Sequence, residues 1–433
     1  MNHEGFQSRL DQVKDVLQRF GLNARDISPI AYEEDCPFPY NNFIYKISLS
    51  EPVTADSFAA NAAPCTFAPR SQGINDLVIR LSNNKAEGLN QANRVENEVA
   101  SLYLARKGLE SSHKPELAEV VPAVFAWQSA KSSDRELGWI LMEFKPGESL
   151  DGHFASLSDV EKKSAIDQIA DVFSGIQTAA LPSTVTSFGG LTVNDKGEII
   201  SGQMTTIDSE GAPWSTYIDF WKAKLASQLK GAEESPALKG WEPNGVRERI
   251  DKFLASDLEG YLVDAGVDLT KRALIHGDLT LNNILFDKQS TKLTAILDFD
   301  FSTILHPTHE FFTSLQDLGG NTGGVFGPDP TAGLLSDALL TGDFDVPGVP
   351  DEAADLWTLA RTWDAALAAR GTLRPSIIEG IAALEGLRRL EAALCPFRLA
   401  HPMFLKRKTG EEIEKERAVA EETLLSRLAS LGF

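Results

Sequence analysis

Apolar residues along this chain form compact runs in some stretches and helical stripes in others. The runs at residues 77–81, 121–127 and 139–144 are short and almost wholly apolar, which is typical of buried strands. Phe43 and Tyr45 lie two residues apart, as the buried positions of a strand should. Elsewhere apolar residues recur at helical spacing, and this periodicity predicts helices at 1–20, 94–106, 166–176, 356–367 and 411–431.

Length and composition agree with a chain that has two hydrophobic cores. It has 433 residues, of which 42% are apolar. No apolar stretch is long enough to cross a membrane, and residues 1–20 are too charged for a signal peptide. The three cysteines, Cys36, Cys65 and Cys395, are widely scattered, which argues against a disulfide framework. We therefore expect a reducing, cytoplasmic setting and no membrane partner.

The net charge restricts the kinds of partner further. A formal charge of −21 argues against nucleic-acid binding, because such binding needs a basic surface that neutralises phosphates. The basic run at 406–408 is short, and we interpret it as a solvated loop. The oligomeric state stays open.

Residues 274–301, LIHGDLTLNNILFDKQSTKLTAILDFDF, hold the densest group of chemically useful side chains. Transfer of a phosphoryl group needs a carboxylate that accepts the acceptor's proton, and oxygen ligands for Mg²⁺. Asp278 would be the base, and Asn283, Asp298 and Asp300 would be the metal ligands. Between them, 284–286 and 295–297 predict two short strands joined by a polar turn, so that Asp298 returns to the neighbourhood of Asn283.

This segment resembles the catalytic core of the aminoglycoside phosphotransferase and choline kinase superfamily. The family pattern is His-Gly-Asp, four residues, Asn, and then a metal-binding Asp, and His276, Gly277, Asp278, Asn283 and Asp298 fill it. Alternatively, the segment could be a surface loop rich in Asn and Asp beside two core strands, but its strand context favours the motif.

The resemblance implies an α+β, protein kinase-like fold with two lobes. A small antiparallel sheet lobe with a preceding helix would occupy residues 1–148, and a larger, mainly helical lobe would occupy 149–433. The implied activity is transfer of the γ-phosphoryl group of ATP, with Mg²⁺, to a hydroxyl of a small metabolite or aminoglycoside-like compound. Asp278 and His276 would be the catalytic residues. The choice between ATP and GTP, and the acceptor, stay open.

The same resemblance assigns nucleotide-binding residues in the N-terminal lobe. Arg80 takes the place of the family's Lys or Arg on a strand, and a carboxylate of the helix at 94–106 should pair with it. Glu98 is favoured for this role, with Glu96 as the alternative. The adenine would meet backbone groups near Glu143 and Phe144.

The phosphate-covering loop departs from the family pattern. Residues 35–45 contain no glycine, although glycine normally lets the backbone approach the nucleotide there. Asn42 could instead donate its side-chain amide. The departure leaves open a catalytically silent relative that binds a ligand or partner. A protein Ser/Thr kinase is less favoured, because Gly277 and Thr280 replace its Arg and Lys.

The C-terminal lobe offers candidates for the acceptor pocket. An acidic chain favours a cationic acceptor such as an amine, although acidity also serves solubility. His306 and His309 could suggest a metal site, but we favour packing, because no thiol or third histidine lies nearby. Further residues have two readings, substrate contact or ordinary packing and surface charge: Asp355, Asp364, Trp214, Tyr217, Phe220 and Trp221.

Overall fold

A five-stranded antiparallel sheet forms the framework of the N-terminal part. The computed structural model describes residues 3–433 apart from 31–35, 37, 38, 71, 87, 131–136, 207–212 and 324–331. The sheet order is β1-β2-β3-β5-β4, and each of the three predicted apolar runs contributes a strand to it, with residues 121–123 and 144 outside the strands. Its strands are β1 (Ala24–Ile30), β2 (Asn42–Val53), β3 (Ile74–Ser82), β4 (Val124–Gln128) and β5 (Trp139–Glu143).

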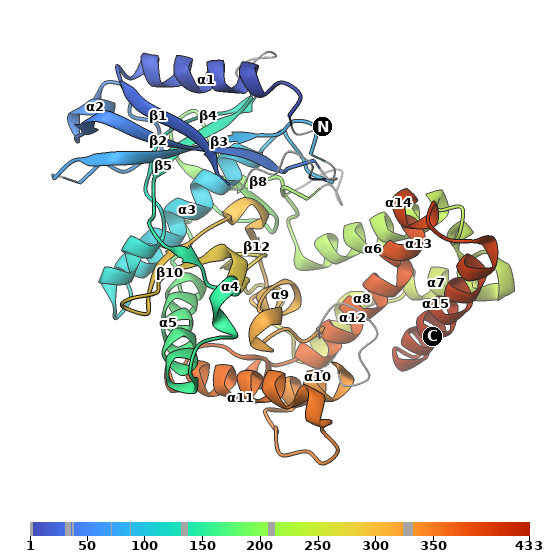
Figure 1. Ribbon diagram of the computed structural model, residues 1–433. Coiled ribbons are helices and arrows are strands. Elements are labelled where there is room, and N and C mark those ends of the chain that lie inside the picture. The colour runs from blue at the N-terminus through green and yellow to red at the C-terminus, as the bar shows by residue number, and fades with distance from the viewer. Residues whose placement is uncertain are drawn as a thin grey trace.

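Two helices cover the opposite faces of this sheet (Figure 1). Leu77 and Leu81 of β3 are buried in one core cluster with residues of α1 (Phe6–Arg19). Because side chains alternate across a strand, Arg80 faces the other side, where α3 (Arg94–Glu110) packs. The alternation of β3 therefore directs a buried arginine toward α3.

The C-terminal part is mainly helical, so the α+β architecture is confirmed. β6 (Glu148–Ser149) pairs with β10 (Ile284–Asp287), which pairs with β11 (Lys292–Ile296). The predicted division between residues 148 and 149 falls within β6 and stays a prediction. No helix in the described parts of the chain is both long enough and apolar enough to cross a membrane.

The other elements are short strand pairs and helices. The strand pairs are β7 (Gly190–Val193) with β8 (Ile199–Gly202) and β9 (Ala273–Ile275) with β12 (Thr303–Leu305). The helices are α2 (Asp56–Ala59), α4 (Asp151–Phe154), α5 (Asp159–Gln177), α6 (Tyr217–Glu234), α7 (Val246–Leu254), α8 (Leu258–Asp264), α9 (Thr308–Thr313), α10 (Ala332–Thr341), α11 (Ala354–Ala369), α12 (Ile381–Leu394), α13 (Phe397–Ala400), α14 (Pro402–Leu405) and α15 (Gly410–Ser430).

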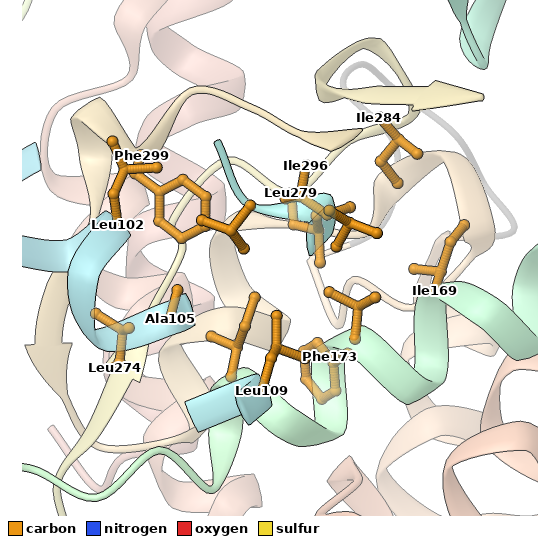
Figure 2. Close-up of a cluster of buried hydrophobic side chains, with 14 of the residues drawn as sticks. Leu102, Ala105, Leu109, Ile169, Phe173, Leu274, Leu279, Ile284, Ile296 and Phe299 are labelled. Atoms are coloured by element: carbon orange, nitrogen blue, oxygen red, sulfur yellow. The ribbon is translucent and has the colours of Figure 1, made fainter. Parts of the chain in front are cut away.

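One hydrophobic cluster joins α3 and α5 to residues 274–299 (Figure 2). Leu102 and Leu109 of α3, Phe173 of α5, and Leu279 and Phe299 are all buried in it. The elements that carry chemically useful side chains therefore share one core, so a shift in either helix would be transmitted to residues 274–299.

The crossing of α3 and α5 depends on two glycines. A Cβ atom added to Gly108 would lie 2.6 Å from the Cβ of Ala179 and 2.7 Å from the carbonyl oxygen of Gly175. A Cβ atom added to Gly175 would lie 2.5 Å from Cδ2 of Leu109. The overlap of the added Cβ atom of Gly108 with the Gly175 carbonyl oxygen involves backbone, so rotation of a side chain cannot relieve it.

Gly108→Ala should therefore destabilise the protein by about 1–3 kcal/mol, because overpacking forces the two helices apart. Gly152→Ala in α4 is the matched control, since a Cβ atom there would meet nothing within 4 Å. Thermal unfolding of both variants measures the difference. Equal melting temperatures for the two variants would contradict the close crossing.

Candidate active site

The loop between β9 and β10 presents Asp278 in a fixed orientation. The Asn283 side-chain amide donates to an Asp278 carboxylate oxygen over 2.9 Å and to the Asp278 carbonyl over 2.8 Å. Gly277 has a φ of 84°, and a Cβ atom there would lie 2.5 Å from the Phe301 carbonyl oxygen. Only glycine fits such a turn without strain. Since the amide nitrogen of Asn283 is used by Asp278, its oxygen is the atom that can serve a cation.

The predicted hairpin is present and brings Asp298 beside Asn283. Ile284 of β10 pairs with Ile296 of β11, and the Leu297 amide donates to the Asn283 carbonyl over 2.8 Å. Asp298 follows directly, with a φ of 64°. This left-handed conformation is uncommon for a residue other than glycine and occurs often at functional sites.

His276 connects the backbone segments that carry the two aspartates. Its Nε2 lies 3.0 Å from the Leu297 carbonyl oxygen, and its Nδ1 accepts from the Asp278 amide over 3.3 Å. The ring is 1% exposed and packs on Phe299, with 4.4 Å between ring centroids. Burial lowers the pKa of His276, so the ring is neutral, with its proton on Nε2. Both nitrogens are occupied by backbone, which favours a positioning role over the predicted catalytic role.

Three residues that the sequence analysis missed accept hydrogen bonds from backbone amides of the loop between β9 and β10. The buried Glu310 carboxylate accepts from the amides of His276 and Gly277, over 2.6 and 3.1 Å. Ser314 accepts from the Leu279 amide, and Asp317 accepts from the Leu281 amide, each over 2.9 Å. Apart from their position shortly after residues 298–300, nothing in the sequence singled them out, because backbone-binding side chains have no fixed motif.

Arg80 and Glu98 form the predicted buried ion pair. The Arg80 side chain is 7% exposed and that of Glu98 is 4% exposed. The alternative partner, Glu96, accepts instead from the Ser129 hydroxyl over 2.7 Å. The structure therefore selects Glu98, which lies on the side of α3 that faces the sheet.

Three further charged residues, Asp298, Asp300 and Arg94, complete a cluster of five buried or partly buried charges with this pair. Nη1 of Arg80 lies 3.2 Å from Asp298, and Nη2 lies 2.8 Å from Asp300. Asp300 is fully buried, and its carboxylate also accepts from Nε of Arg94 over 2.8 Å. Two cations already occupy the surroundings of Asp300, which disfavours the predicted role as a metal ligand. Asp298, whose side chain is 35% exposed, has room for that role.

Burial and neighbouring charges shift the ionisation of the cluster. Burial raises the pKa of Glu98, and the negative charges of Asp300 and Asp298 add to the effect that Arg80 opposes. Burial acts to lower the pKa of Arg80, but Glu98, Asp300 and Asp298 together raise it. Burial, followed by the charge of Asp298, raises the pKa of Asp278 to about 6. Asp278 is thus a stronger base than an ordinary aspartate.

The side chains of the predicted adenine-binding segment are engaged within the protein. Glu143 is 9% exposed and pairs with Lys145 over 2.8 Å, while its amide donates to the Ala123 carbonyl over 2.9 Å. The Lys46 ammonium lies 4.1 Å from the centroid of the Phe144 ring. Any contact with the adenine of a nucleotide would therefore come from the Phe144 ring or from backbone beyond Glu143. Of the predicted phosphate-covering loop, residues 35–45, residues 35, 37 and 38 lie outside the described residues.

His306 and His309, which follow residues 298–301, are both buried. His309 is 5% exposed, and its Nε2 lies 2.9 Å from the Tyr217 hydroxyl. The other aromatic candidates for the acceptor pocket, Trp214, Phe220 and Trp221, are buried with Tyr217 in the core. Of the acidic candidates, Asp355 is exposed, and Asp364 lies 3.4 Å from Arg374. Among the described residues, no three His, Cys, Asp or Glu side chains are grouped to hold a metal.

Comparison with known proteins identifies the family. Residues 70–370 match the model of the phosphotransferase enzyme family. The chain belongs to the phosphotransferase enzyme family. The match covers every candidate site residue of this phosphotransferase except Asn42. A comparison with curated protein sequences gave no match.

Solved structures similar to this phosphotransferase include an aminoglycoside phosphotransferase and an ethanolamine kinase. The aminoglycoside phosphotransferase APH(2'')-Ib in its ADP-bound form is 12% identical, with a TM-score of 0.47 and coverage of 96% of this chain and 98% of that chain. An ethanolamine kinase of Plasmodium vivax is 11% identical, with a TM-score of 0.40 and coverage of 93% and 82% respectively.

The pKa of Asp278 predicts how its replacement changes stability. Its pKa of about 6 in the folded protein lies above the ordinary value of 3.8, so the folded state binds more protons between these pH values. Stability must therefore fall as pH rises through this window. Asp278→Asn should stabilise the metal-free phosphotransferase by about 1 kcal/mol at pH 8, after allowance for solvent screening, and by almost nothing near pH 3.5.

Thermal unfolding at the two pH values measures this difference. Asp15→Asn on the exposed side of α1 is the control, and its effect should be small at both pH values. A lower melting temperature for Asp278→Asn at pH 8 would contradict a carboxylate whose charged form is disfavoured by folding.

Proposed function

We propose that this phosphotransferase is an ATP- and Mg²⁺-dependent kinase that phosphorylates a hydroxyl of a small molecule. The observation that carries the proposal is the convergence of a base, two hard oxygen ligands and a buried arginine from separate parts of the chain. Asp278, Asn283 and Asp298 are joined by the hairpin contacts, and Arg80 reaches Asp298 over 3.2 Å. Phosphoryl transfer needs this set of groups.

Asp278 would accept the proton of the acceptor hydroxyl as that oxygen attacks the γ-phosphorus. The new oxygen–phosphorus bond forms while the bond to the β–γ bridging oxygen breaks, and its electron pair leaves with ADP. The Asn283 amide holds the carboxylate of Asp278 in one orientation. His276 and Glu310 hold the backbone of the loop, so they position the base without touching the substrate.

Asp298 and the amide oxygen of Asn283 would hold the metal ion. Both are hard oxygen donors, and Mg²⁺ in nucleotide sites is usually bound by one or two protein carboxylates together with phosphates. When bound, Mg²⁺ would neutralise charge on the nucleotide phosphates. The protein would supply two ligands rather than a complete cage.

Arg80 would bind the nucleotide phosphates. Its Nε atom is buried and has no hydrogen-bond partner among the described residues. A guanidinium binds phosphate as a planar fork, unlike the point charge of lysine. Phe144 and the backbone beyond Glu143 would then meet the adenine.

A cationic acceptor is favoured by the acidic surroundings of the base. Asp298, Asp317 and Glu310 all contribute negative potential at Asp278, in a chain with a formal charge of −21. Amino alcohols and aminoglycoside-like amines carry both the charge and the hydroxyl that the site requires.

A thermal-shift titration with ATP, with and without Mg²⁺, tests the proposal, because a ligand of the folded state raises the melting temperature. We expect a shift that grows with Mg²⁺, and Asp298→Asn should remove the growth. Asp15→Asn should behave as wild type. Saturation at 100 times the dissociation constant corresponds to about 2.7 kcal/mol of stabilisation. No shift with millimolar ATP would favour a silent relative, and phosphate incorporation into generic proteins would favour a protein kinase.

A further inference from the structure

Asp300 lies at the meeting point of three elements of the nucleotide-binding half. Its carboxylate contacts Arg80 of β3 over 2.8 Å and Nε of Arg94, the first residue of α3, over 2.8 and 3.1 Å. The Asn42 amide nitrogen, at the first residue of β2, donates to the same carboxylate over 3.2 Å. The Asn42 oxygen accepts from Nη2 of Arg94 over 3.0 Å. Asn42, Arg94 and Asp300 thus form a closed triangle, the Asp300 clasp.

The two charged residues of the clasp are shielded from water, while Asn42 is partly exposed. Asp300 is 0% exposed and Arg94 is 1% exposed. A carboxylate at this depth requires paired cations and hydrogen bonds, since a buried charge that loses its partner is strongly destabilising. Both oxygens of Asp300 face guanidinium groups, so a divalent cation placed there would also face two positive charges. The geometry therefore suits an anchor better than a metal ligand.

The charge balance separates Asp300 from Asp298. Arg80 and Arg94 supply two positive charges, and Glu98, Asp298 and Asp300 supply three negative charges. If Asp298 turns to a bound cation, the two arginines remain balanced by Glu98 and Asp300. The partly exposed Asp298 can turn away from Arg80 to bind a cation. The buried Asp300 cannot turn away from the arginines without leaving Arg94 unpaired.

The clasp also anchors the start of β2. Asn42 is the first residue of this strand, and both polar atoms of its side chain are used by the clasp. Asn42 belongs to the predicted phosphate-covering loop, residues 35–45, which contains no glycine. An anchor at the start of β2 holds its end at a defined place relative to Arg80 and Asp298.

We propose that the Asp300 clasp positions Arg80 and the start of β2 for nucleotide binding, and that Arg94 and Asp300 are positioning residues for the kinase. The inference rests on the proposed function, because it assumes that nucleotide phosphates bind beside Arg80. The clasp acts on the phosphates whether or not a metal is present. A metal ligand, in contrast, acts only when the metal is present, and this difference makes the inference testable.

The experiment measures the dissociation constant of ATP in EDTA and again in Mg²⁺, for wild type, Asn42→Ala, Arg94→Gln, Asp300→Asn, Asp298→Asn and the double variant R94Q/D300N. We expect Arg94→Gln and Asp300→Asn each to weaken ATP binding about tenfold in EDTA, the loss expected for a misplaced charged hydrogen bond. The double variant should lose no more than either single variant, because both remove the same clasp. Asp298→Asn should weaken binding only in Mg²⁺.

Two further variants separate positioning from loss of folding. Asn42→Ala leaves no buried charge unpaired, so it should weaken ATP binding about threefold in EDTA with little change in melting temperature. Arg388→Gln is the matched control, since Arg388 forms a two-point pair with the buried Glu385 in α12. It should lower the melting temperature and leave the ATP dissociation constant unchanged.

The outcomes distinguish the two proposals. If wild type binds no ATP, the proposed function fails, and the clasp loses its ligand. If wild type binds ATP and Asp300→Asn loses only the Mg²⁺-dependent part, as Asp298→Asn does, Asp300 is a metal ligand and the clasp is overturned. The clasp is also overturned if Asn42→Ala and Arg94→Gln bind ATP in EDTA as tightly as wild type.

Discussion

The buried charge cluster around Arg80 is the constraint on which the rest of this site depends. Arg80 comes from the sheet, Glu98 and Arg94 from α3, and Asp298 and Asp300 from the segment after the hairpin. None of these charges could be buried alone, because each would face a large cost of desolvation. The three elements must therefore pack together, and their mutual pairing sets the position of Arg80 relative to Asp298 and Asp300.

The loop that carries Asp278 is held by a different kind of interaction. Neighbouring side chains satisfy its backbone amides. Glu310, Ser314 and Asp317 accept from four of these amides, and His276 links the loop to the strand that leads to Asp298. These contacts hold the backbone around Asp278 and do not involve its carboxylate. The loop and the charge cluster meet at Asp298, which both the hairpin and Arg80 reach.

Much of the architecture could be predicted from the sequence because the relevant signals are local. The apolar runs at 77–81 and 139–144 marked strands of the sheet, and the polar turn between 284–286 and 295–297 marked the hairpin. The spacing of Asp278 and Asn283 placed them in one loop, where they are hydrogen bonded. The partner of Arg80 was narrowed to Glu98 or Glu96, and only the packing of α3 decided between them. Asp300 and His276 show the limit of prediction from local sequence signals, since their roles depend on contacts with distant residues.

The sequence by itself determined several of the strands and helices, the family pattern around Asp278, and the residue types available for phosphoryl transfer. These follow from periodicity and short spacing, which act within a few neighbouring residues. Tertiary structure decided which polar groups are bound by other groups of the protein and which remain available to a ligand. It buried Asp300 between Arg80 and Arg94, left Asp298 partly exposed, and used both nitrogens of His276 for backbone. The physical reason is that the cost of a buried charge or polar group depends on partners brought together from far along the chain, and no local pattern records those partners.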